Sequence, residues 1–413
     1  MTTQTMTMEK KSSLANLKKV ILGLQHLIAM FGATVLVPIL TGFNPSVALV
    51  AAGCGTLIFH FCTQKKVPVF LGSSFAFIPV IILVRDTMGG LAYAQGGIIV
   101  AGLLYVGLSF LVRAIGVEKI TRFLPPQVVG PMIMVIGLNL IPVALGMASG
   151  SWMLAGITLG VALGVTFLTK GFIKQLAILA GVLTGYLVAT FTGVVDFTPV
   201  HEAALVALPA FTLPKFSLAA ILTIAPVVVA VFMEHIGDVT TNGAVVGKDF
   251  MKDPGLNRTL LGDGLATIFA GLIGGPANTT YGENTGVLAI TKNYDPSILR
   301  LAAIFAIGLG MVGKLGASLQ TIPVPVMGGI SIMLFSMIAL IGVKTIKNAK
   351  VAFNWKNILV MGVILTLGFG ATYIERWTGV SLAIPLTSSV KIAGLSFAAI
   401  VGVGLNALIN RDQ

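Results

Sequence analysis

Charged residues are scarce in this chain. Only 10% of its 413 residues are Asp, Glu, Lys or Arg, while 56% are hydrophobic; in a soluble domain about a quarter of the residues are charged. A soluble protein of this length would lack the charged surface that it needs in water. Long apolar runs separated by short polar loops instead predict an all-α polytopic membrane protein.

Cysteine is almost absent, and so is any sign of a cleavable signal. Cys54 and Cys62 fall in one hydrophobic segment, which favours small core residues over a disulfide. The polar and basic stretch 1–19 runs directly into a long apolar segment with no small-residue cleavage site. We therefore expect the first segment to remain in the membrane.

Acidic residues are fewer than basic ones, which gives a formal net charge of +12. Such a charge could indicate a nucleic-acid partner, but the distribution of the basic residues among the loops is explained by the orientation of the chain in the membrane. With the N-terminus in the cytoplasm, alternating loops place most Lys and Arg inside, as the positive-inside rule expects, and the C-terminus is also cytoplasmic. The rule uses about 14 expected segments, near 14–40, 46–63, 67–84, 93–113, 127–147, 151–169, 176–193, 220–246, 258–274, 276–292, 298–317, 325–343, 357–374 and 390–409.

The two halves of the chain share residues at constant offsets. Gly53 falls on Gly262 with an offset of 209, and Pro126 falls on Pro325 with an offset of 199. Seven segments per half is an odd number, so the second half enters the membrane from the opposite side. This predicts seven-plus-seven inverted repeats, a plan found in secondary transporters. The repeats are residues 1–193 and 220–413, joined by 194–219, with a hinge expected at 194–215.

Two segments are interrupted at matching positions of the two repeats. Segment 67–84 contains VPVFLGSSFAFIPV, and segment 276–292 overlaps GGPANTTYGENTGVLAI. Extended backbone at membrane depth must be buried in protein or line a cavity, so we expect the two breaks to pair as short antiparallel strands. The half-helices that follow would point free N–H groups at one spot, which suits carbonyl oxygens or anions. The alternative is a pair of kinked helices with glycines for close packing.

Four acidic residues fall inside expected segments, where a charge is costly and usually functional. Glu234 and Asp238 are spaced i, i+4 and share one helix face, and Glu283 lies in the second break. Two carboxylates at one site can accept N–H donors from a polar substrate, and one can take a proton. For Asp263, packing or capping is favoured over function; the alternative for Glu283 is a cap of its own half-helix.

Two further side chains are candidates. His26 lies in the middle of the first segment, where a structural donor is favoured over a ligand; His235 is interpreted as structural. Phe75 would be assigned to the core or the lipid face by composition alone. Its place in a Gly-Ser-Ser break makes it a candidate stacking surface for a planar ligand.

Several motifs together resemble one family. These are QHLIAMFGATVLVP (25–38), GSSFAFIP (72–79), MEHIGD (233–238), KDFMKDPGLNRTLLGDG (248–264) and NTTYGENTGV (278–287). They are similar to the uracil permease branch of the nucleobase–cation symporter family 2, also called the nucleobase:ascorbate transporter family. The resemblance implies 14 helices, a homodimer, a core domain (14–113 plus 220–317) and a gate domain (125–193 plus 325–409).

The resemblance also implies roles for individual residues. Glu234 and Glu283 would hydrogen-bond a pyrimidine, and backbone near Gly282 and Phe75 would complete the site, with Tyr281 adjacent. The candidate proton-coupling residues are His26, Glu234 and Asp238. Bacterial uracil permeases can carry a histidine at the position of Asp238, whereas several purine-transporting relatives carry an aspartate there. Because of this departure, the residues of the proton relay stay open, and the assignment of uracil as the substrate is slightly weaker relative to xanthine or uric acid.

The expected function is secondary active import of uracil with a cation, H⁺ or alternatively Na⁺, across a bacterial inner membrane. The partners are then a nucleobase and the lipid bilayer, with no nucleic acid and no cofactor. A xanthine or uric acid permease is one alternative. An anion carrier of similar fold is another, but two midplane carboxylates would repel an anion. A membrane enzyme is disfavoured because the sequence contains no HExxH spacing.

Overall fold

The structure is a computed structural model that describes residues 3–117, 119, 125–379, 382–385 and 391–410. Most described residues are helical. In the first half, the helices are α1 (Thr3–Thr41), α2 (Pro45–Cys62), the 3₁₀ turn η1 (Phe75–Phe77), α3 (Ile78–Thr87), α4 (Leu91–Ile115), α6 (Pro126–Ala148), α7 (Trp152–Leu168), α8 (Gly171–Gln175), α9 (Ala177–Phe191) and α10 (Thr198–Glu202).

The second half is also helical, with two π-helical turns, η2 (Met251–Gly255) and η3 (Thr366–Gly370). Its α-helices are α11 (Leu218–Ile224), α12 (Val227–Val246), α13 (Leu256–Ile273), α14 (Gly282–Thr291), α15 (Pro296–Gly310), α16 (Gly313–Gln320), α17 (Val324–Asn348), α18 (Trp355–Leu365), α19 (Ala371–Thr378) and α20 (Gly394–Ile409). The strands within the described residues are β1 (Leu71–Ser73), β2 (Asn278–Thr280), β3 (Ala383–Pro385) and β4 (Lys391–Ala393).

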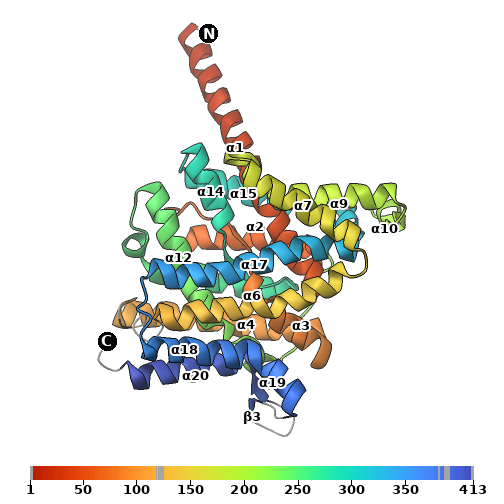
Figure 1. Cartoon of the computed structure of the whole chain (residues 1–413). Coiled ribbons are helices and arrows are strands. Elements are labelled where there is room, and N and C mark those ends of the chain that lie inside the picture. The colour runs from red at the N-terminus through yellow and green to blue at the C-terminus, as the bar shows by residue number, and fades with distance from the viewer. Residues whose placement is uncertain (1–2, 118, 120–124, 380–381, 386–390, 411–413) are drawn as a thin grey trace.

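The helices form a bundle in which α4, α6, α17, α18 and α20 run roughly parallel to one another (Figure 1). The C-terminal end of α20 lies at one end of this bundle and α10 at the other, while the start of α1 projects away from it (Figure 1). Within the described residues, six helices are long and apolar enough to cross a membrane, and five shorter helices are also apolar. The protein is therefore a multi-pass membrane protein. The expected count of 14 spans and the repeat organisation stay predictions, and residues 411–413 lie outside the described part.

Helix ends follow from local sequence. α2 begins where the Asn44 side chain accepts hydrogen bonds from the N–H groups of Ser46 and Val47, with Pro45 in the first turn. α12 and α13 end at Gly247 and Gly274, which have φ values of 78° and 91°. Glycine enters this left-handed region without the steric cost of a side chain.

The helices α6 and α17 pack directly against each other through small residues. A Cβ atom at Gly137 of α6 would lie 2.5 Å from the carbonyl oxygen of Phe335 and 2.5 Å from the N–H of Ala339, both in α17. Helices in a membrane associate through such close backbone approach, because lipid supplies no hydrophobic drive between them. The run GPMIM (130–134) of the first half and the run GGISIM (328–333) of the second half therefore lie on neighbouring helices.

The structure differs from expectation in several segments. The segment expected at 220–246 is divided into α11 and α12, and the segment expected at 390–409 begins as the strand β4. The segment expected at 298–317 is two helices, because Val312 is extended and pairs with Val206 of the connecting stretch. The segment expected at 357–374 passes through η3, and Asn139 donates a hydrogen bond to the Gly368 carbonyl there, at 3.0 Å. The antiparallel β3–β4 pair was not expected.

The connecting stretch between the halves is held over its second part. The Thr212 N–H donates to the Ile273 carbonyl at 3.4 Å, and the Lys215 N–H donates to the Ala92 carbonyl at 2.8 Å. These bonds attach the stretch to the ends of α13 and α4. The expected hinge over 194–215 thus includes residues that are hydrogen-bonded to neighbouring helices.

Candidate functional site

The two interrupted segments meet as a strand pair, as the sequence predicts. β1 and β2 are antiparallel, with Leu71 opposite Thr280, Gly72 opposite Thr279 and Ser73 opposite Asn278. All six residues are buried. The pairing satisfies backbone groups that lipid could not, which is the condition for extended chain at membrane depth.

Polar side chains of neighbouring helices hold the strand pair. Asn278 donates a hydrogen bond to the Ala51 carbonyl of α2 at 3.0 Å, and Thr267 of α13 donates to the Asn278 carbonyl at 2.9 Å. The Leu71 N–H donates to the Thr56 hydroxyl of α2 at 2.9 Å. The strands are therefore fixed relative to both α2 and α13.

A helical turn begins directly after each strand. η1 and then α3 follow β1, and α14 follows β2 at Gly282. Within the described residues, neither N-cap side chain, Ser74 nor Tyr281, bonds to the first turn. Apart from the Glu283 N–H, which bonds to its own carboxylate, the N–H groups of these first turns are available to an acceptor outside the helix, and the positive ends of the helix dipoles favour negative charge.

Three carboxylates gather beside the start of α14. Glu234 and Asp238 come from α12 and Glu283 from the first turn of α14, and all three side chains are half-buried. The charge of Glu283 acts on both α12 carboxylates, and Glu234 and Asp238 act on each other. The Glu283 carboxylate also accepts a hydrogen bond from its own backbone N–H, so part of its role is local to α14.

Asp238 has a partner that sequence reasoning missed. The Thr280 hydroxyl, in β2, donates a hydrogen bond to Asp238 Oδ2 at 2.8 Å. The polar run Asn278-Thr279-Thr280 inside a membrane segment was the available signal, because intramembrane polar groups need partners. No pattern in the sequence indicates which of these side chains faces α12.

His26 is buried and connects α1 to α14. Asn284 donates from Nδ2 to His26 Nδ1 and to the His26 carbonyl, each at 3.1 Å. With Nδ1 accepting, the neutral imidazole carries its proton on Nε2. Asn284, adjacent to Glu283, is a second residue that sequence reasoning missed. In both contacts His26 accepts the hydrogen bond, so the structural donor role expected for it, like its role in proton coupling, stays a prediction.

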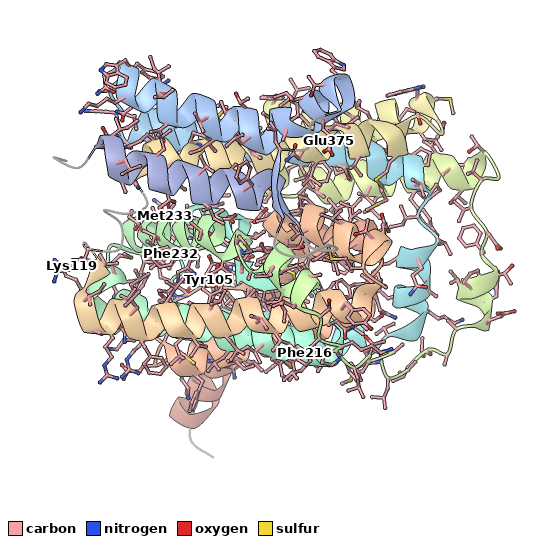
Figure 2. The ribbon with its side chains drawn as sticks, turned by 90° about the horizontal axis from the view of Figure 1, so that it is seen from below. Tyr105, Lys119, Phe216, Phe232, Met233 and Glu375 are labelled. Atoms are coloured by element: carbon pink, nitrogen blue, oxygen red, sulfur yellow. The ribbon has the colours of Figure 1, made fainter. Side chains whose placement is uncertain are left out.

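His235 bonds to none of the three carboxylates Glu234, Asp238 and Glu283. It belongs to a separate buried cluster. Its Nδ1 lies 3.0 Å from Asp263 Oδ2, and its Nε2 lies 2.9 Å from the Thr259 hydroxyl. Figure 2 shows the neighbouring Phe232 and Met233 of α12 in the interior together with Tyr105 of α4. Both imidazole nitrogens are engaged, which is the geometry of a structural tie between α12 and α13.

The two aromatic candidates occupy different surroundings. Phe75, the first residue of η1, is half-buried and packs beside two hydrophobic clusters. Tyr281 is 3% exposed, and its hydroxyl donates to the Ser73 carbonyl at 2.8 Å. Gly282 is exposed at the start of α14. The structure thus brings together the two strands, the start of α14 and the α12 carboxylates, while the Tyr281 hydroxyl bonds to the protein itself.

Comparisons with known proteins agree on one family. The model of a permease family matches residues 17–376. The chain is 42% identical to the "Probable uracil permease" of Haemophilus influenzae, over 97% of this chain and 96% of that one. It is 41% identical to the "Uracil permease" of Bacillus subtilis, over 94% and 91%. Among solved structures, the transmembrane domain of a cyanobacterial bicarbonate transporter, BicA, matches with a TM-score of 0.61 and 16% identity, over 85% and 94%.

Proposed function

The chain belongs to the permease family, as a membrane transporter and not an enzyme, and from this premise we propose that it imports uracil. Curated relatives about 40% identical over nearly the whole chain are named uracil permeases. The structural observation that carries the proposal is the group formed by Glu234, Asp238 and Glu283 at the start of α14. Carboxylate acceptors thus lie beside the first turn of α14, with Asp238 Oδ1 3.9 Å from a Cβ atom built on Gly282.

The chemistry of the group suits a planar ring that carries both N–H and carbonyl groups. The carboxylates of Glu234 and Glu283 accept N–H donors, and the N–H groups at the start of α14, near Gly282, donate to a carbonyl. The half-buried Phe75 ring supplies an apolar face for stacking. In this proposal Tyr281 supports the site indirectly, because its hydroxyl bonds to the Ser73 carbonyl and fixes the strand pair.

Transport is proposed to be coupled to a proton, with Na⁺ as the alternative ion. Like charges within one site cannot all be ionised cheaply, so Glu234, or Asp238 beside it, holds the coupling proton. His26 would assist through Asn284. Two domains, core (14–113 plus 220–317) and gate (125–193 plus 325–409), would rock against each other to give alternating access.

The remaining features of the proposal concern assembly and placement. We place the protein as a homodimer in a bacterial inner membrane, with 14 spans in inverted repeats and both termini in the cytoplasm. The distribution of Lys and Arg among the loops supports this orientation.

Two other substrates compete with uracil. Asp238, where uracil permeases can carry histidine, favours xanthine or uric acid. An anion is the other alternative, but the similarity to a bicarbonate transporter is one of fold alone. The three carboxylates at the start of α14 would also repel an anion.

The deciding experiment is uptake of labelled uracil into proteoliposomes with an imposed proton or sodium gradient. We expect a proton gradient to drive accumulation, and unlabelled uracil to compete better than xanthine, uric acid or sulfate. Equal uptake with and without any ion gradient would contradict coupling. Competition by sulfate alone would favour the anion carrier, and competition by xanthine alone the purine permease.

A further inference from the structure

The hydroxyl of Thr280 lies where a strand of one interrupted segment meets a carboxylate of α12. It donates to Asp238 Oδ2 at 2.8 Å, and Thr280 is 3% exposed. A hydroxyl that donates to a carboxylate makes one of the stronger hydrogen bonds in proteins, and burial removes competition from water. The bond therefore determines where this carboxylate sits.

The donor itself is held in place. Thr280 pairs with Leu71 across the two strands, and Asn278, two residues earlier, bonds to α2. Threonine is β-branched, so its side chain has few rotamers available in a strand. The hydroxyl direction is thus set by the strand pair, whereas Asp238 sits on a separate helix.

The second carboxylate oxygen faces the proposed site. Asp238 Oδ1 would lie 3.9 Å from a Cβ atom built on Gly282, the first residue of α14. Oδ2 already accepts the hydrogen bond of the Thr280 hydroxyl, so Oδ1 is the oxygen left to face the start of α14.

The charged and titratable groups around Asp238 come from three elements. Glu234 and His235 lie on α12 itself, Glu283 lies on α14 and Tyr105 lies on α4. Two of the four are carboxylates, which repel a charged Asp238. A neutral donor that stabilises the charged form offsets this repulsion without adding another charge.

We propose that Thr280 is a positioning residue that holds Asp238 Oδ2, so that Oδ1 alone exchanges the coupling proton at the start of α14. This inference rests on the proposed proton-coupled uracil import. It links the strand pair to the coupling carboxylate: a movement of β2 with α14 moves the hydroxyl that holds Asp238.

The chain offers a matched control in the neighbouring residue. Thr279 lies in the same strand and is also 3% exposed, and its hydroxyl has no partner among the described residues. Thr279→Val and Thr280→Val make the same chemical change one residue apart. Thr280→Ser keeps the hydroxyl and removes only a methyl group.

The first test observes Asp238 without transport. Infrared difference spectra of the purified protein between acidic and basic pH contain the carbonyl band of protonated Asp238, identified by its loss in Asp238→Asn. We expect this band to move to higher frequency in Thr280→Val and to remain in place in Thr279→Val and Thr280→Ser. An unchanged band in Thr280→Val overturns the inference; Thr280→Ala repeats the comparison if the valine variant does not fold.

The second test uses uptake of labelled uracil into proteoliposomes under an inward proton gradient. We expect Thr280→Val to lower uptake about tenfold, because a hydrogen bond to a charged group is lost, and its pH profile to extend to higher pH. Thr280→Ser should restore uptake, and Thr280→Val should have no further effect on the pH profile of Asp238→Asn. Wild-type protein that moves no uracil contradicts the proposed function, whereas the infrared result still decides the role of Thr280.

Discussion

The hydroxyl of Tyr281, the residue after β2, donates a 2.8 Å hydrogen bond to the backbone carbonyl of Ser73, the last residue of β1. A side chain of the second interrupted segment is thus hydrogen-bonded to the last residue of the strand in the first. The Tyr281 N–H makes a second link, to the Phe70 carbonyl at 3.1 Å. The aromatic residue next to the proposed site therefore belongs to the frame of the strand pair.

Tyr281→Phe should destabilise the protein while leaving the proposed ligand contacts in place. The change leaves the buried Ser73 carbonyl without its donor, at a cost of about 1–3 kcal/mol. We expect a lower unfolding temperature in detergent, with uracil uptake reduced less than in the carboxylate variants below. Tyr373→Phe is the control, because Tyr373 is 40% exposed on α19. Equal unfolding temperatures for the two variants would show that the Ser73 bond contributes little.

Glu234→Gln and Glu283→Gln should each abolish uptake of labelled uracil in cells that lack their own permease. Each change removes a charged acceptor and introduces an amide N–H donor, which would face the N–H groups of the substrate. Glu375→Gln on α19 should be neutral, because that side chain is exposed. Normal uptake by either site variant would remove that residue from the proposed site.

Gly72→Ala should disturb the site through overpacking. An added Cβ would collide with the ring of Tyr281 and lie 2.8 Å from the Thr34 hydroxyl. Extra volume in a packed interior costs about 1–3 kcal/mol. We expect a lower unfolding temperature and weak uptake. Gly107→Ala, which meets nothing within 4 Å in α4, should behave like the wild type; similar losses in both variants would point to a general intolerance of alanine.

A salt bridge between α1 and α15 should make a small pH-dependent contribution to stability. Partial burial tends to raise the pKa of Asp295, but hydrogen bonds from Lys19 and Ser297 and the Lys19 charge lower this pKa to about 2. The Lys19 Nζ lies 2.8 Å from Asp295 Oδ2. Because the folded pKa is lowered, the stabilisation is present above the ordinary pKa, about 4, and is lost as the pH falls through the folded value.

Lys19→Met should therefore lower the unfolding temperature at pH 7 and lose this difference in acid. The effect should be below about 1 kcal/mol, because both side chains are more than a third exposed and solvent screens the pair. Unfolding temperatures measured from pH 7 down to pH 2 provide the check. A difference that persists at pH 2 would assign the effect of Lys19 to packing instead of charge.

The strand pair could be predicted from the sequence, but its register could not. Gly and Pro in two short membrane segments predicted extended chain, and the need to satisfy backbone groups in lipid predicted that the two pieces pair. The register, with Gly72 opposite Thr279, could not be predicted. It depends on side chains such as Asn278 and Thr267, whose partners lie on other helices.

The sequence by itself determined the class of protein, the approximate positions of the long apolar helices and the intramembrane carboxylates, because hydrophobicity and the cost of buried charge are local properties of a segment. The tertiary structure alone decided the partners: Thr280 for Asp238, Asn284 for His26, Asp263 for His235 and Ser73 for Tyr281. A hydrogen bond needs its two atoms within about 3 Å of each other. Such distances between residues far apart in the chain arise only when whole helices pack, and no local pattern encodes them.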